Sequence, residues 1–466
     1  MTYYINIFHS NCPDGQASLL ARLHDQSSRD DQVLNIGYPA PAAIKIEELV
    51  AKIKGAVPEG KNFQLSFLDI FPQIRGLNAD QVISKFKEEF GDRIIIVNAD
   101  HHQHAKLSVE TVGVKNLYSA NAAGVGIALN DTSPVARIAI GEKNIAILEL
   151  ADFCDLMVGQ RAEIQMSHSE LSEFYSKSRE AANLIAKDIG IEAVGEKDKE
   201  VMRRYGIKEE NMLLFAVASK VHTALGKGIS DQIKKLCQDK FCHGDEMFGK
   251  AADVTKGLLD IVSRQQPLTE TLDKISTLLD DTIYLTKEQT SKIFLDQRIA
   301  ESMKDNQKLP LVLGNQDRTS ALFDIMAVSR VQQDGADYLI LLKDCLSEAK
   351  DLDTLSKLTV EEFTASLAKD GKIAFSGRGN SKKDVTDAFN AIFTSGPEGT
   401  LGGGFGGYPC CGGMISADKI NFKELLLVVK DEVRTRPNLG KTPSSSLCRP
   451  ISAACGSRQG DACVVQ

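Results

Sequence analysis

The segment IIIVNADHHQHA, residues 94–105, runs from a block of β-branched residues directly into an acid and three histidines. Isoleucine and valine in series are typical of a strand that is buried on both faces. The chain has only 8 histidines, and 3 of them lie at positions 101, 102 and 104. The end of this strand is therefore the strongest candidate for a chemical site.

Four more short apolar runs share the first 160 residues with this strand, which extends over residues 93–100. They are rich in Ile, Val, Leu and Phe and lie at residues 3–8, 32–38, 63–71 and 144–150. Segments between them carry apolar residues at three-to-four spacing, which predicts helices. Strand–helix alternation with nearly continuous apolar strands predicts an α/β fold, with a doubly wound, mostly parallel sheet covered on both faces.

The length of 466 residues is too great for one hydrophobic core and predicts two or three domains. The α/β pattern fills residues 1–165, and residues 166–309 change to helical periodicity with few prolines. Residues 310–432 return to a smaller mixed α/β pattern with a glycine-rich stretch, and residues 433–466 are rich in Ser, Pro, Arg and Gly. The last segment has little to bury, so we expect it to be disordered.

The overall charge argues against a protein that grips long nucleic acid. The net charge is −8 and the pI is about 5.6, whereas phosphate contacts along a nucleic acid call for a basic surplus. A small anionic substrate in a local site is compatible with this charge. No apolar run approaches the roughly 18 residues of a membrane span or forms a signal segment, so we expect a cytoplasmic protein with reduced, scattered cysteines.

Acids and histidines stand at the ends of four of the predicted strands, and in a parallel sheet these ends meet at one edge. Each alone has an ordinary explanation, since an Asp after a strand is usually a turn or cap residue and His104 fits an exposed helix start. Together they predict a shared site for a hard cation such as Mn²⁺ or Mg²⁺. The residues are His9, Asp14, Asp69, Asp100, His101, His102 and Asp155, with Asp152 supporting Asp155.

Four of these motifs, in this order, resemble the DHH phosphoesterase superfamily. NADHHQHA carries the Asp-His-His signature, FHSNCPDGQAS resembles the first motif, FLDI the second and ADFCD the fourth. Downstream, KIAFSGRGN and the glycine-rich GGGFGGYPCCGG resemble the DHH-associated C-terminal domain. The resemblance covers roughly residues 1–160 and 310–420, while the helical block between them is longer than the family suggests.

The resemblance implies a function for each matched residue. It implies two Mn²⁺ ions, with Mg²⁺ as a substitute: His9 and Asp14 hold one ion, His101 and Asp155 the other, and Asp69 bridges both. His102 would touch the scissile phosphate, and Asp100 would orient its neighbours. In the C-terminal domain the far end of the substrate would be bound by Ser376, Arg378, Gly404, Gly406, Gly407 and Tyr408.

Two positions depart from the family pattern. Gln16 stands where many members carry a second Asp, and the nearby Cys12 is a poor ligand for a hard cation. Tyr408 stands where the glycine-rich loop usually ends in His, so it can stack on a base but carries no charge. These changes weaken one metal position and alter the substrate loop without excluding activity.

The function that follows is Mn²⁺-dependent hydrolysis of short oligonucleotides, cyclic dinucleotides or small phosphorylated nucleotides by a water activated between two metals. Two alternatives stay open. One is an inorganic pyrophosphatase or exopolyphosphatase. The other is a nucleotide-binding protein that no longer cleaves, because of Gln16 and Tyr408.

The last four residues, CVVQ, fit the C-a-a-X prenylation pattern and predict a farnesyl group on Cys463. Cys448 and Cys455 lie upstream, where a second acyl chain could supply the second signal that stable anchoring needs. A chain modified in this way would bind a membrane surface in a eukaryotic or host cell without a spanning helix.

Overall fold

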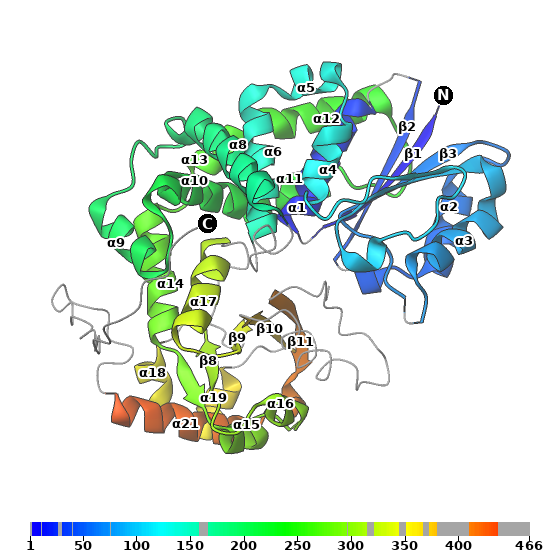
Figure 1. Cartoon of the computed structure of the whole chain (residues 1–466). Helices are drawn as coiled ribbons and strands as arrows, with labels where there is room; N and C mark the ends of the chain where they lie inside the picture. Colours follow the sequence, from blue (N-terminus) through cyan, green and yellow to red (C-terminus); the bar gives the residue numbers. More distant parts are fainter. Residues whose placement is uncertain are drawn as a thin grey trace, which may run out of the picture.

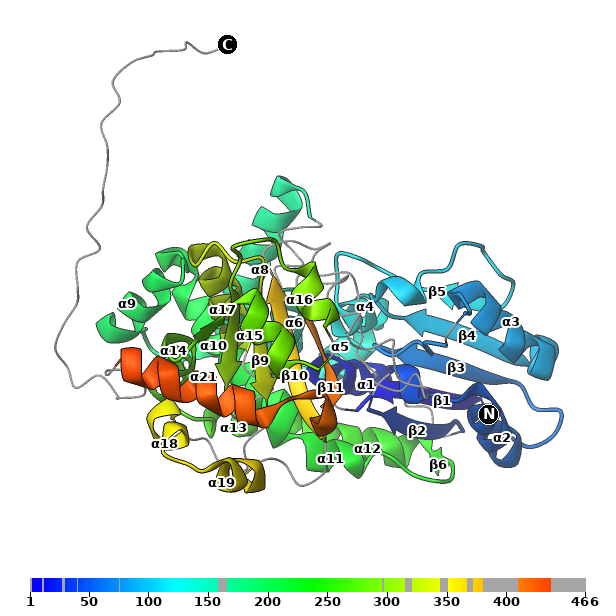
Figure 2. The same cartoon turned by 90° about the horizontal axis from the view of Figure 1, so that it is seen from below.

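The computed structural model describes residues 2–10, 12–26, 30–39, 41–74, 76–157, 166–295, 297–314, 321–343, 351–366, 372–379 and 410–436. Figure 1 shows an upper lobe that holds the first sheet and most of the helices, and a lower lobe that holds a second sheet. Figure 2 gives the view from below, in which the first sheet lies on one side of the molecule and the second on the other.

The first sheet has the predicted parallel, doubly wound character. Its strand order is β5-β4-β3-β1-β2-β6, and every neighbouring pair is parallel except β2 and the short β6. The chain therefore builds outward from β1 in both directions. The strands are β1 (Tyr3–His9), β2 (Gln32–Tyr38), β3 (Phe63–Leu68), β4 (Ile94–Ala99), β5 (Val114–Asn116) and β6 (Cys242–His243).

Helices cover both faces of this sheet. The sheet therefore separates two hydrophobic cores, one on each face. On one face Ile5, Leu65 and Phe67 pack with the apolar sides of α2 (Ile46–Ala56) and α3 (Ala79–Phe90). On the other face the larger core contains Phe8, Leu68 and residues of α1, α4, α5 and α6. These last helices are α1 (Pro13–Asp25), α4 (Gly124–Asp131), α5 (Pro134–Ile140) and α6 (Glu142–Met157).

The prediction of a strand at residues 144–150 was wrong, because this segment lies inside α6 (Glu142–Met157). A short apolar run cannot be distinguished by periodicity from part of a buried helix, and α6 is buried along most of its length. Asp152 and Asp155 therefore reach the site from a helix and not from a strand end.

Further helical segments follow in the described part of the chain and contribute buried residues to the same core as α6. They confirm the helical periodicity of the middle of the chain. They are α8 (His168–Ala186), α9 (Glu196–Arg204), α10 (Met212–Thr223), the π-helix η6 (Ala224–Gly228), α11 (Ser230–Lys234), α12 (Gly244–Lys256), α13 (Leu258–Ser263) and α14 (Leu268–Asp280).

The second sheet has five strands in the order β11-β10-β9-β8-β7, and only the β8–β9 pair is parallel. Its own core joins the strands to the surrounding helices. The strands are β7 (Ile283–Leu285), β8 (Leu309–Leu313), β9 (Tyr338–Lys343), β10 (Lys372–Gly379) and β11 (Cys410–Ser416). The helices of this core are α15 (Lys287–Ile293), α16 (Arg298–Ser302), α18 (Leu352–Ser356), α19 (Val360–Ala365) and α21 (Phe422–Thr435). The helix α17 (Ala321–Gln333) packs instead with the other face of β8 and β9, in the large core that also contains α6.

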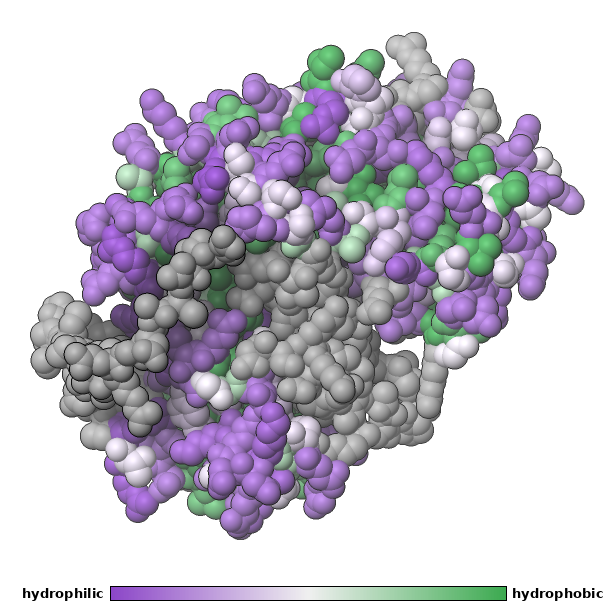
Figure 3. Space-filling view, viewed as in Figure 1, coloured by the Kyte–Doolittle hydropathy of each residue, from purple (hydrophilic) through white to green (hydrophobic). Residues whose placement is uncertain are grey.

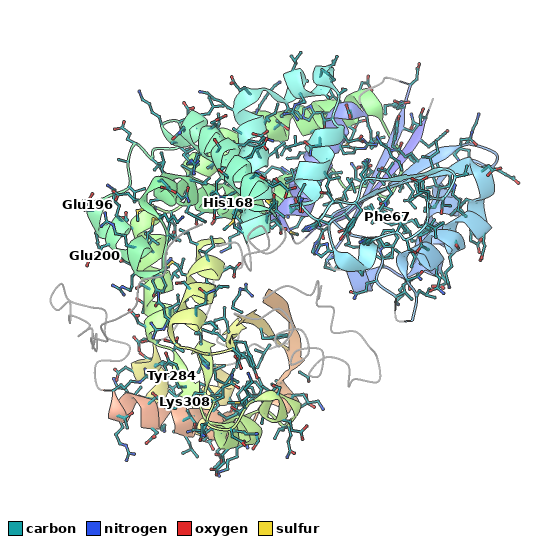
Figure 4. All side chains as sticks on the ribbon, viewed as in Figure 1. Phe67, His168, Glu196, Glu200, Tyr284 and Lys308 are labelled. Carbon is teal, nitrogen blue, oxygen red and sulfur yellow. The ribbon has the colours of Figure 1, made fainter. Side chains whose placement is uncertain are left out.

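The second sheet begins earlier than the predicted boundary at residue 310, since β7 lies within the segment expected to be a helical connector. Figure 4 places Tyr284 of β7 and Lys308 beside each other in the lower lobe, far from Phe67 of the first sheet. The division into four domains as a whole stays a prediction.

Several predicted residues lie outside the described part of the chain. They are Gly404, Gly406, Gly407, Tyr408, Cys463 and the side chain of Ser376. None of the described helices is long and apolar enough to cross a membrane. The face seen in Figure 3 is mainly hydrophilic where residues are described, with hydrophobic residues in small groups.

Candidate metal centre

The candidate centre lies where the strand order of the first sheet reverses, between β1 and β3. Open α/β sheets bind ligands outside the carboxyl ends of the strands at this point. His9 ends β1, Asp69 follows β3, and Asp100, His101 and His102 follow β4. The parallel register places these strand ends side by side, because Leu68 pairs with both Phe8 and Ala99.

Asp69 occupies the middle of this group. Its side chain is 1% exposed, and its carboxylate Oδ1 lies 3.0 Å from His101 Nε2 while Oδ2 lies 3.4 Å from His9 Nδ1. Neither carboxylate oxygen receives a properly aligned hydrogen bond. The backbone of Asp69 has φ 55, which is uncommon for a residue with a Cβ and tends to mark functional sites.

His101 links the two sides of the centre. Its Nε2 lies 3.0 Å from Asp69 Oδ1, 3.6 Å from Asp155 Oδ2 and 3.9 Å from Asp14 Oδ2. The side chains of His101, Asp69 and Asp14 are each 1% exposed. Three carboxylates thus lie near one imidazole nitrogen, and of these only Asp155, at 19% exposed, reaches solvent to any extent.

His9 is oriented by the backbone of the β2–α2 connection. Its Nε2 lies 3.0 Å from the carbonyl oxygen of Pro39, which can only accept, so we assign the proton to Nε2. Nδ1 then presents a lone pair toward Asp69. A backbone carbonyl that fixes the tautomer is the usual support for a histidine that ligates a metal.

Asp100 is held in place by three donors. Its Oδ2 accepts the N–H of Phe71 at 2.7 Å, and its Oδ1 accepts the N–H of His102 at 2.8 Å and contacts the Nδ1 of that ring at 2.7 Å. Burial raises the pKa of Asp100, but the neighbouring His102 outweighs it and lowers the pKa below the ordinary value. Asp100 is therefore an ionised carboxylate that orients His102.

Asp14 is fixed by the start of α4. Its Oδ2 and Oδ1 accept the N–H groups of Gly124 and Val125 at 2.8 and 2.7 Å. The preceding amide, of Ala123, donates to Asp152 Oδ1 at 2.7 Å. The first amides of a helix carry partial positive charge, so α4 stabilises two carboxylates that come from α1 and α6.

Gly124 and Gly126 were missed as site residues by sequence reasoning. A Cβ on Gly124 would lie 2.6 Å from Asp69 Cβ and 2.9 Å from Asp14 Oδ2, and one on Gly126 would lie 2.3 Å from Asp152 Oδ1. Only glycine lets α4 approach the carboxylates this closely. The Gly-x-Gly of AAGVGIALND, residues 122–131, was the available signal.

The charges in this cluster favour a bound cation. Burial, and then the neighbouring Asp69 and Asp155, raise the pKa of Asp14 well above its ordinary value. Burial also raises the pKa of Asp69, but the close imidazoles of His101 and His9 lower it well below the ordinary value. Buried, mutually repelling carboxylates with unpartnered oxygens match the ligand set of a metal ion, so these residues could hold one.

The described ligand atoms fall into overlapping groups, in each of which the atoms lie within 4.8 Å of one another. One contains Asp69, Asp100, His101 and His102; another contains Asp14, His101 and Asp155; a third contains His9, Cys12 and Asp69. The structure thus brings all seven predicted metal and catalytic residues together. It groups Asp14 with His101 and Asp155, whereas the resemblance implied a shared ion with His9.

Gln16 and His104 are two further positions that the sequence singled out. Gln16 is buried, and its Nε2 donates to Ser10 O at 2.7 Å and Ser230 Oγ at 3.2 Å. His104 is partly buried, whereas an exposed side chain was expected: its Nε2 lies 3.0 Å from Phe71 O, and burial lowers its pKa.

Arg378 lies on β10 of the second sheet and is 4% exposed. Its guanidinium forms an ion pair with Asp324 of α17, and its Nη1 donates to Gly377 O at 2.8 Å. To bind a substrate phosphate, as the resemblance implied, this side chain would exchange Asp324 for the phosphate.

Comparisons with known proteins give two solved structures of low similarity to this chain. No family model matches the chain, and a search of curated proteins also finds no match. An uncharacterized protein from Helicobacter pylori G27 is 12% identical with a TM-score of 0.26, over 92% of this chain and 99% of that chain. An exopolyphosphatase-related protein from Bacteroides fragilis is 11% identical with a TM-score of 0.29, over 94% and 93%. At these TM-scores neither likeness bears on the function of this chain.

Proposed function

We propose that this chain is a metal-dependent phosphoesterase of the DHH type, with Mn²⁺ or Mg²⁺ at the end of the first sheet. One observation carries the proposal: Asp69 is buried between two imidazoles and near further carboxylates, and neither of its oxygens accepts a well-aligned hydrogen bond. Burying several carboxylates next to one another costs several kcal/mol, by the order of magnitude for buried ions. A bound cation would compensate these buried carboxylates.

The chain's own residues would share the work as follows. His9, Asp14, Asp69, His101 and Asp155 would hold the cations, and α4 would keep Asp14 in position through the amides of Gly124 and Val125. When bound, divalent cations lower the pKa of water and neutralise phosphoryl oxygens, which is the chemistry that hydrolysis of a phosphoester requires.

His102 would contact the substrate. Asp100 fixes the Nδ1 side of its ring, so Nε2 is the nitrogen that would face a phosphoryl oxygen, and the ring protonated on both nitrogens would donate a hydrogen bond to it. Its side chain is 15% exposed, compared with 1% for His101, so the two neighbouring histidines have different access to a bound molecule. This supports a ligand role for His101 and a substrate role for His102.

The proposed substrates are short oligonucleotides, cyclic dinucleotides or small phosphorylated nucleotides, with the second sheet and the glycine-rich stretch holding the far end. The acidic net charge of −8 supports small substrates over long nucleic acid. The alternatives are a pyrophosphatase or exopolyphosphatase, and a nucleotide-binding protein without activity.

A substrate panel tests the proposal. Metal-free protein is supplied with Mn²⁺ and given a short oligonucleotide, a cyclic dinucleotide, a nucleoside bisphosphate, pyrophosphate or polyphosphate. We expect mononucleotide or phosphate release from a nucleotide substrate, lost by more than about 100-fold in Asp69→Asn, because changes even to supporting residues cost roughly 10–100-fold.

The alternatives give different results in the same panel. Hydrolysis of pyrophosphate or polyphosphate alone would support a pyrophosphatase or exopolyphosphatase. Tight nucleotide binding without any product would support a nucleotide-binding protein without activity. Full turnover in Asp69→Asn would contradict the site itself.

A further inference from the structure

Cys12 lies in the candidate metal centre, although its residue type is unusual for a hard cation. The turn from β1 to α1 carries the sequence His9-Ser10-Asn11-Cys12-Pro13-Asp14. Its potential ligands divide between two groups: Cys12 lies with His9 and Asp69, while Asp14 lies with His101 and Asp155. The thiol therefore occupies the place beside His9 that a carboxylate was expected to fill.

The first group has the geometry of atoms that share one ion. The three ligand atoms of His9, Cys12 and Asp69 lie within 4.8 Å of one another, and metal–ligand bonds to N, O and S are about 2.0–2.3 Å long. The lone pair of His9 Nδ1 faces Asp69, because Nε2 is engaged by Pro39 O. His9 Nδ1 and both oxygens of Asp69 are buried and have no hydrogen-bond partner.

The two groups differ in chemistry. His9, Cys12 and Asp69 offer one nitrogen, one sulfur and one oxygen, a set that suits borderline-soft ions such as Zn²⁺, Co²⁺ and Fe²⁺. Asp14, His101 and Asp155 offer two carboxylates and an imidazole, a set that suits Mn²⁺ or Mg²⁺ better.

We propose that Cys12 is a thiolate ligand and that the two positions of the centre select different metals. The position at His9, Cys12 and Asp69 takes Zn²⁺, Co²⁺ or Fe²⁺, and the position at Asp14, His101 and Asp155 takes Mn²⁺ or Mg²⁺. This inference rests on the proposed metal-dependent function, and it assigns a metal class to one half of the same site.

Cobalt provides a readout that is independent of activity. Metal-free full-length protein is titrated with Co²⁺ while the near-ultraviolet spectrum is recorded, since a cysteine thiolate bound to Co²⁺ gives a charge-transfer band that nitrogen and oxygen ligands lack. We expect the band in the native chain, its loss in Cys12→Ser, and its retention in Cys154→Ala. Cys154 is the matched control because it lies between Asp152 and Asp155 on α6, with its thiol directed to Ala218 O.

A second variant tests selectivity. Cys12→Asp replaces sulfur by a carboxylate at the same place, so we expect its affinity for Zn²⁺ to fall at least tenfold relative to its affinity for Mn²⁺, measured by calorimetric titration of both ions. An unchanged Zn²⁺/Mn²⁺ ratio would overturn the proposed selection.

The outcomes separate this inference from the proposed function. Binding of Co²⁺ without a charge-transfer band, or a band that persists in Cys12→Ser, would overturn the thiolate ligand and leave the phosphoesterase proposal intact. A band that depends on Cys12 in a protein that hydrolyses no phosphoester would support the ligand and overturn the phosphoesterase. No Co²⁺ binding at all would overturn both.

Discussion

Buried charged side chains have different surroundings in the two sheets. In the second sheet Arg378 is 4% exposed and is matched by Asp324, at 7%, in an ion pair within the chain. In the first sheet Asp69 is 1% exposed and lies among other acids and imidazoles, and neither of its oxygens accepts a well-aligned hydrogen bond. The ion pair in the second sheet needs no ligand to compensate its charges, whereas the acids in the first sheet do.

This difference teaches how to separate structural from functional charge in a fold of unknown function. A buried charge that is paired and hydrogen-bonded can hold two elements together, here α17 and β10. Buried like charges without partners destabilise the fold unless something else is bound. The comparison therefore predicts which substitutions disturb folding and which disturb the response to metal.

The largest expected effect on folding comes from the pair in the second sheet. Asp324→Ala would remove the carboxylate that pairs with the buried guanidinium of Arg378 and should lower the free energy of unfolding by about 3–5 kcal/mol. The double variant Asp324→Leu/Arg378→Met should recover most of the loss, because the pair is replaced by apolar side chains. Chemical denaturation measures both.

The pair would have to be interpreted differently if Asp324→Ala folded with unchanged stability and bound nucleotides more tightly. That result would mean that Arg378 is available to substrate, as the family resemblance implied.

A smaller effect is expected at Gly124, where the first sheet meets α4. Gly124→Ala places a methyl group 2.6 Å from Asp69 Cβ, so the carboxylates must shift, at a cost of about 1–3 kcal/mol for overpacking. We expect weaker Mn²⁺ binding by calorimetry. Gly55→Ala is the matched control, since its Cβ on α2 would meet nothing within 4 Å. Equal Mn²⁺ affinity in the two variants would show that the close approach of α4 does not position the carboxylates of the centre.

The smallest effect concerns a buried group away from both sites. His24 is 3% exposed, with Nε2 3.0 Å from Thr255 Oγ1, and burial lowers its pKa although Asp25 opposes the shift. At a pH between the lowered pKa of His24 in the folded chain and its ordinary pKa in the unfolded chain, the unfolded chain binds more protons than the folded one. Stability should therefore fall as the pH drops below about 6.5, the ordinary histidine pKa, and level off below the folded-state pKa.

His24→Gln removes the titrating ring and keeps a hydrogen-bond donor for Thr255. Its melting temperature should depend less on pH over this range than that of the native chain. If the melting temperatures of the two proteins changed equally with pH, the histidine would contribute nothing to the pH dependence.

Much of the centre could be predicted from sequence because its ligands follow strands with clear apolar patterns. Ile94–Val97 and the residues before His9 and Asp69 mark β4, β1 and β3, and a parallel sheet brings their ends together. The helix α6 was mistaken for a strand because seven apolar-rich residues carry no decisive period. Asp155 was still identified, since its position in the motif did not depend on the element that carries it.

The remaining features depend on tertiary contacts that no local pattern encodes. The carbonyl of Pro39 fixes His9 from another loop, and the start of α4 fixes Asp14 across 110 residues of chain. The grouping of Cys12 with His9, in place of Asp14, follows from how the β1–α1 turn is folded. Residue types gave the chemistry of the site, and packing decides which ligands share an ion.

Thermal unfolding with and without a divalent cation tests the central claim, that the carboxylates of the first sheet form a cation site. Mn²⁺ at 100 times its dissociation constant should stabilise the native chain by about 2.7 kcal/mol and raise its melting temperature, and EDTA should reverse the shift. Asp69→Asn, which keeps the shape of the side chain, should show little or no shift. An equal Mn²⁺ shift in the native chain and in Asp69→Asn, or none in the native chain, would contradict the account.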